Sequence, residues 1–229
     1  MKEKIYLIPG LMTDHRLWHR LEPYLEEYEL IHTPIPLSEN FDEMVDVLHE
    51  NFADEKINLL GFSLGGYLAS YYAIQYPSKV QRLFLVGSTP SATELKDISR
   101  RQQKLDEARQ SKFTPLSLEK ARELLEHKED VALAQTVVDM FNDLGHKHFL
   151  PQLASTLNRE NLFDKLNTLS IPTKMFYSQN DRLLNHNSIK QIMQKEHDLQ
   201  ITAREGTSHN IPLEVPSCLS KEIRDWMAT

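Results

Sequence analysis

The sequence contains a single cysteine, Cys218, among its 229 residues. One thiol cannot form an intramolecular disulfide, and it lacks the second thiol that a cysteine zinc or redox pair requires. We therefore expect neither a disulfide scaffold nor a cysteine-based metal or redox centre. This cysteine content is typical of proteins in a reducing compartment, so we expect a cytoplasmic location.

Long apolar runs and an excess of basic residues are also absent. No stretch approaches the length of a membrane span, and the apolar run after Lys4 is too short for a signal-peptide core. The formal net charge is -7, and the basic residues are dispersed rather than gathered into one stripe. These absences argue against a membrane, secreted or nucleic-acid-binding protein. We expect a soluble monomer or homodimer whose partner is a small molecule.

Short apolar runs alternate with amphipathic stretches along much of the chain. Runs of β-branched and aliphatic residues predict six strands, at 5–8, 28–33, 56–60, 80–86, 173–178 and 199–203. Apolar residues three and four apart predict helices at 14–25, 41–48, 64–76, 187–196 and 216–227. This alternation is typical of an α/β protein with a mostly parallel, doubly wound sheet of about six strands.

Residues 89–168 interrupt the alternation. They contain almost no β-branched run, and Lys, Glu, Gln and Leu recur there with helical spacing. We interpret this stretch as a helical cap inserted after the fifth strand of a single domain. The core of that domain would comprise residues 1–88 and 169–229, which is an ordinary size for one α/β unit.

The residues Gly61-Phe62-Ser63-Leu64-Gly65 stand where an apolar strand meets a helix. A serine hydroxyl is a poor nucleophile at neutral pH, so a catalytic serine needs a base and donors for the oxyanion that forms. A sharp strand-to-helix turn exposes the serine in a strained conformation, and the flanking glycines let the helix approach the strand. The pattern predicts Ser63 as a nucleophile and the amide of Leu64 as an oxyanion donor; a structural turn with an inert serine is the alternative.

Four segments in chain order resemble those of α/β-hydrolases: Ile8-Pro9-Gly10-Leu11, the Ser63 turn, Asn180-Asp181 and Ser208-His209. The resemblance extends over nearly the whole chain. A looser likeness to the small, capped, serine esterase-like hydrolases of that family rests on Gly145 to Arg159, Pro172, Asp181, His209, Glu214-Val215-Pro216 and Trp226. The family resemblance implies an acid and a histidine on loops after later strands, which are Asp181 and His209 here. It also implies a second oxyanion donor after the first strand, namely the amide of Leu11, with Met12 as the alternative.

Position distinguishes His209 from the nine other histidines. Three of these lie in the helical insertion, four precede the Ser63 turn, and His186 and His197 belong to a helix or its ends. Only His209 follows a late strand through a loop. Asp181 is less distinctive, because a lone aspartate there could cap the next helix, and Asp164 is the alternative acid.

Several other features are expected to be structural. The Lys/Glu-rich run 94–130 has the composition of a solvated helical face. Arg159 is expected in a helix-surface ion pair, with contact to a substrate carboxylate as the alternative. His146 and His148 have a spacing that metals use, but no carboxylate cluster accompanies them, so no metal and no cofactor are expected.

Together these residues predict acyl transfer to water, with Ser63 attacking, His209 moving the proton and Asp181 orienting His209. The resemblance implies a small carboxylic ester as the default substrate. Thioesters, amides, lactones and the carbon–carbon bonds of diketones are handled by the same apparatus, as is some lyase chemistry. A non-catalytic binding or scaffold protein on the same fold is the alternative from another class.

Overall fold

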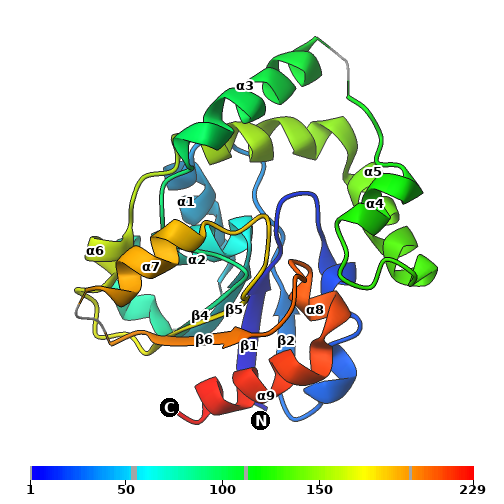
Figure 1. Cartoon of the computed structure of the whole chain (residues 1–229). Helices are drawn as coiled ribbons and strands as arrows, with labels where there is room; N and C mark the ends of the chain where they lie inside the picture. The colour runs from blue at the N-terminus through cyan, green and yellow to red at the C-terminus, as the bar shows by residue number, and fades with distance from the viewer. Residues whose placement is uncertain (1, 53–55, 111–112, 196–197) are drawn as a thin grey trace.

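The computed structural model describes residues 2–52, 56–110, 113–195 and 198–229. At its centre is a six-stranded sheet in the order β2-β1-β3-β4-β5-β6, and every neighbouring pair is parallel (Figure 1). The strands are β1 (Lys4–Ile8), β2 (Glu29–His32), β3 (Ile57–Phe62), β4 (Val80–Val86), β5 (Thr173–Ser178) and β6 (Gln200–Arg204). Each of the six predicted strands is present, within two residues of its expected bounds.

The strand order reverses between β1 and β3. The chain passes from β1 outward to β2 and then returns to place β3 on the other side of β1. In an open parallel sheet such a reversal leaves a crevice at the carboxyl ends of the two central strands, where ligands bind. The loops that follow β1 and β3 therefore flank the expected site.

Helices cover both faces of the sheet, as the doubly wound prediction requires. One apolar layer packs α1 (Phe41–Asn51), α2 (Leu64–Gln75), α6 (Phe163–Leu166) and α7 (His186–Met193) against the sheet. The opposite layer contains α8 (Ile211–Glu214), α9 (Pro216–Met227), the 3-10 helix η1 (His15–Trp18), and Leu21 and Leu25, which flank the 3-10 helix η2 (Glu22–Tyr24). Strand β3 is buried on both sides, which explains why it is apolar along most of its length instead of alternating.

The helical segment between β4 and β5 contains α3 (Leu95–Arg109), α4 (Leu118–Glu123), α5 (Val131–Ser155), η4 (Thr156–Asn158) and α6. Helix α3 and part of α5 lie across the top of Figure 1 and α4 lies at the upper right, all away from α9. The segment reaches the carboxyl edge of the sheet, because the side chain of Gln152 accepts a hydrogen bond of 2.8 Å from the amide of Met12, just after β1.

The place of this segment corrects one prediction. It follows the fourth strand rather than the fifth, and β4 and β5 pair directly as neighbours. Its two ends meet at the sheet, since the amide of Leu162 donates to the carbonyl of Pro90 over 2.9 Å. The helical segment therefore begins and ends at nearly the same point.

The predicted helix at 14–25 is also wrong, because the structure has η1 and η2 there instead. Asp14 caps η1 as expected, accepting from the amide of Arg16. Pro23 lacks the N–H that a continuous α-helix would need at this position, so the chain forms two short 3-10 turns. The helix predicted at 187–196 ends at Met193, and residues 196 and 197 lie outside the described part of the chain. No helix in the described ranges is long and apolar enough to span a bilayer.

Candidate active site

Ser63 lies between the last residue of β3 and the first residue of α2. Its φ of 51° and ψ of -114° fall where residues with a side chain are rarely found. Helix α2 can start immediately because Gly61 and Gly65 lack side chains. A Cβ on Gly61 would lie 2.3 Å from the carbonyl oxygen of Gly65, and one on Gly65 would lie 2.2 Å from that of Pro9. The structure thus contains the strained strand-to-helix turn that the sequence predicts.

Three loops at the carboxyl edge of the sheet bring Ser63, His209 and Asp181 together. The Oγ of Ser63, after β3, lies 3.0 Å from Nε2 of His209, after β6. The Nδ1 of His209 lies 2.6 Å from Oδ2 of Asp181, after β5. The His209 side chain is 12% exposed and that of Asp181 is 0% exposed. A hydroxyl, an imidazole and a buried carboxylate are therefore arranged in a single hydrogen-bonded line.

The second carboxylate oxygen of Asp181 fixes the side chain in place. Oδ1 accepts a hydrogen bond of 2.9 Å from the amide of Leu183, which leaves Oδ2 for His209. The cap of the next helix, α7, is Asn185 rather than Asp181. Asp164, the alternative acid, has a side chain that is 73% exposed and pairs with Lys195. The structure places Asp181, not Asp164, beside His209.

Two backbone amides near Ser63 have no acceptor among the described residues. These are the amide of Leu64, the first residue of α2, and the amide of Leu11, in the loop after β1. That loop passes close to the serine, because a Cβ on Gly10 would lie 3.1 Å from the Cβ of Ser63. The Met12 amide donates to Gln152 instead, so Leu11 is the residue of this loop whose amide is available.

Glutamates from two elements hold the loop that carries His209. The carboxylate of Glu126, between α4 and α5, accepts from the amides of Thr207 and Ser208 over 2.9 and 2.7 Å and pairs with Arg204 at 2.8 Å. The carboxylate of Glu214 bonds the Ser208 hydroxyl and accepts from the amide of Glu126 over 2.7 Å. The Arg204 guanidinium and the two amides lower the pKa of Glu126 to about 2, against the opposing effect of partial burial.

These contacts were not predicted. Glu126 lies within the run 94–130, which the sequence suggested was only a solvated face, yet it bonds residues about eighty positions away. The spacing of residues within a helix gives no information about hydrogen-bond partners so far away in the sequence. Arg159 also differs from its expected ion pair: its Nη2 donates to the carbonyl of Thr89 over 2.8 Å, and its guanidinium lies 4.2 Å above the Tyr67 ring.

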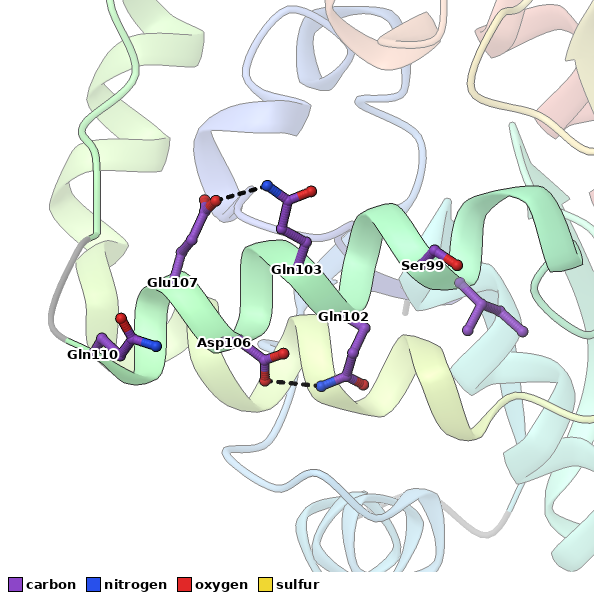
Figure 2. Close-up of a pocket in the computed structure, with 7 residues that line it drawn as sticks. Ser99, Gln102, Gln103, Asp106, Glu107 and Gln110 are labelled. Carbon is purple, nitrogen blue, oxygen red and sulfur yellow. Dashed lines mark hydrogen bonds between the residues drawn. The ribbon is translucent and has the colours of Figure 1, made fainter.

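A recess of about 590 Å³ lies on the surface of α3, away from Ser63, and is lined by seven residues between 98 and 110. Figure 2 shows that its polar side chains pair along the helix, Gln102 with Asp106 and Gln103 with Glu107. A groove built from the outer face of one helix does not enclose a substrate. Within the described ranges, no group of three or more His, Cys, Asp or Glu side chains is arranged to hold a metal ion.

Comparison with known proteins is consistent with this geometry. The sequence model of the family described as the alpha/beta hydrolase fold matches residues 4–214 of this chain. Monoacylglycerol lipase ABHD6 of Bos taurus is 23% identical over 257 residues, which cover 100% of this chain and 76% of that protein. A thermophilic esterase from Thermogutta terrifontis has a similar fold, with a TM-score of 0.84 and 19% identity over 100% of this chain and 90% of that chain. The enol-lactonase of Burkholderia xenovorans LB400 also has a similar fold, with a TM-score of 0.83 and 14% identity over 100% of this chain and 92% of that chain. This chain therefore belongs to the α/β-hydrolase fold family.

Proposed function

We propose that this protein is a serine hydrolase that cleaves a small carboxylic ester into an acid and an alcohol. The observation that carries the proposal is the unbroken hydrogen-bonded line from Ser63 through His209 to Asp181. The names of similar proteins support the ester class, since one is a monoacylglycerol lipase and another an esterase.

The first half-reaction transfers the acyl group to the enzyme. Ser63 Oγ attacks the carbonyl carbon while its proton passes to Nε2 of His209, and Asp181 stabilises the imidazolium that results. When the tetrahedral intermediate collapses, His209 gives that proton to the leaving alkoxide, which departs as the alcohol. In the second half-reaction a water molecule loses a proton to His209 and attacks the acyl group on Ser63. The acid is released, and the proton returns to Ser63.

The charge that develops on the carbonyl oxygen requires donors that are already in place. We assign the amides of Leu64 and Leu11, because both lie beside Ser63 and neither has an acceptor among the described residues. The positive end of α2 adds a favourable field at the same point. One such donor is worth about 10²- to 10³-fold in kcat in other acyl-transfer enzymes.

A fluorophosphonate probe tests the proposal directly, because it reacts only with an activated serine. We expect the wild type to be labelled at Ser63, and the Ser63→Ala and His209→Ala variants to remain unlabelled although folded. Ser99→Ala, which removes an exposed hydroxyl on α3, is the matched control and should label normally. A folded wild type that resists the probe would refute the enzyme and favour a binding protein. A panel of p-nitrophenyl esters of increasing acyl length then defines the preferred substrate.

A further inference from the structure

Two arginines near the candidate active site have polar atoms without partners. Arg101, on α3, and Arg159, just after η4, are both half-buried. The Nε of each is shielded from solvent and has no hydrogen-bond partner in the described part of the chain. A buried donor without an acceptor is costly, because it loses water and gains nothing in exchange. These two positions are therefore candidates for contact with a ligand.

Among the described residues, no carboxylate forms a salt bridge with either arginine. Asp97 lies near Arg101 but pairs with Arg100 at 2.8 Å, and the Glu160 side chain pairs with Lys165 at 3.1 Å. Burial lowers the pKa of both guanidiniums, and burial together with the nearby positive charge of Arg101 lowers the pKa of Arg159 to about 10. Both remain charged at neutral pH, so two like charges share a poorly solvated region.

Contacts through Thr89 and Tyr67 link Arg159 to the turn that carries Ser63. Its Nη2 donates to the carbonyl of Thr89, and the preceding Ser88 hydroxyl donates to the carbonyl of Ser63 over 2.7 Å. Its guanidinium stacks on Tyr67, one turn of α2 beyond Ser63. These contacts hold the planar guanidinium in one orientation and use only one of its five N–H groups. Helix α3 packs against η4, which brings Arg101 to the same region.

We infer that Arg159 and Arg101 bind a carboxylate carried by the substrate, in addition to the carbonyl that Ser63 attacks. The inference rests on the proposed function and specifies its substrate class as anionic esters, such as monoesters of dicarboxylic acids. A guanidinium held by a ring and a carbonyl presents its remaining N–H groups in the geometry that a carboxylate accepts. The bound carboxylate would also act as the negatively charged partner that neither arginine has among the described residues.

The test compares esters that differ only in this charge. In mono-p-nitrophenyl glutarate a carboxylate replaces the terminal methyl group of p-nitrophenyl pentanoate, so kcat/KM for the two reports recognition on the acyl side. Sodium 4-(butanoyloxy)butanoate and butyl butanoate, followed by pH-stat, form the equivalent pair on the alcohol side. We expect the wild type to prefer the anionic member of at least one pair by about 10-fold or more, the lower range for a hydrogen bond between charged groups.

Variants then locate the recognition. Arg159→Gln and Arg101→Gln should each lower kcat/KM for the anionic ester by more than for its neutral partner and so remove most of the preference, and Arg159→Lys should retain part of it. Arg100→Gln removes the neighbouring but exposed charge of α3 and should change nothing. The inference fails if the wild type shows no preference, or if each arginine variant affects both members of a pair equally, as loss of packing would.

A measurement without turnover separates this inference from the proposed function. Glutarate should raise the thermal unfolding midpoint of the wild type and protect Ser63 from the fluorophosphonate probe, whereas pentanediol should do neither. The midpoint shift should disappear in both glutamine variants. Probe labelling without any effect of glutarate would overturn the inference but leave the hydrolase intact. A glutarate-dependent midpoint shift that needs both arginines, without labelling, would support the anion site and refute the hydrolase.

Discussion

Replacement of Glu126 by glutamine should loosen the loop that carries His209. The carboxylate accepts from the amides of Thr207 and Ser208 and from both Nη atoms of Arg204. Its side chain is 23% exposed, so solvent screens these contacts only partly. Glutamine keeps the size of the side chain but removes the charge, and it turns an NH₂ group toward some of the same donors. The change thus isolates the electrostatic part of the contact.

The expected loss of stability follows from the pKa of Glu126. That pKa is about 2 in the folded protein against an ordinary value of 4.5, and each pH unit corresponds to about 1.4 kcal/mol. The charged form therefore contributes about 3 kcal/mol to the free energy of unfolding. Because the folded pKa is depressed, the contribution is complete above pH 4.5 and is lost as the pH falls toward 2.

Urea denaturation of the wild type and of Glu126→Gln across this pH range tests the reasoning. We expect a difference of about 2 to 3 kcal/mol at pH 7 that narrows steadily below pH 4.5, together with a lower kcat. Glu129→Gln, in the same connection but with a side chain that is 81% exposed, should match the wild type throughout. A difference that stays constant with pH, or its absence at pH 7, would refute the assignment.

Two further substitutions test the turn and the acid. Gly65→Ala should destabilise the protein by about 1 to 3 kcal/mol, since the added Cβ would lie 2.2 Å from the carbonyl oxygen of Pro9. An unchanged thermal midpoint would show that α2 approaches β1 less closely than described. Gly145→Ala is the comparison variant: nothing lies within 4 Å of the added Cβ, so its effect reports only the strain of a positive φ. Asp181→Asn should lower kcat by about 10⁴-fold with little change in KM, because the amide favours the wrong imidazole tautomer; a loss below about tenfold, measured with p-nitrophenyl esters, would exclude Asp181 as the orienting acid.

Much of the sheet and the turn at Ser63 could be predicted from local pattern, and the roles of Asp181 and His209 followed from the resemblance to α/β-hydrolases. The buried parallel strands appear as short apolar runs, and the turn at Ser63 requires glycines at fixed spacing. Asp181 and His209 each follow a strand that the pattern finds, so their meeting with Ser63 is a consequence of topology. At the strands and at the Ser63 turn, the residues that the local backbone requires are also the residues that the overall fold requires.

Other features depend on distant partners that a pattern does not contain. Nothing beside Glu126 in the sequence indicates that it accepts hydrogen bonds from the His209 loop, and nothing beside Arg101 indicates that one face of α3 is turned inward. Helix α5 also contains a kink that the sequence pattern did not predict, at Gly145, whose φ is 59°. Contacts such as that between Gln152 and Met12 join the helical segment to the sheet edge, and the composition of the run 94–130, which suggested a solvated face, carries no sign of them.

The hydrogen bond between Leu162 and Pro90 has an implication for how such a protein diversifies. Because the helical segment leaves and rejoins the core at one point, its length and sequence can change without altering the spacing of β4 and β5. A duplication, deletion or exchange within it that spares Glu126 and Gln152, which bond the His209 loop and the loop after β1, would leave the nucleophile, base and acid in position while replacing the walls around them. Selection could then alter the range of molecules accepted in small steps, with the chemistry preserved at every step.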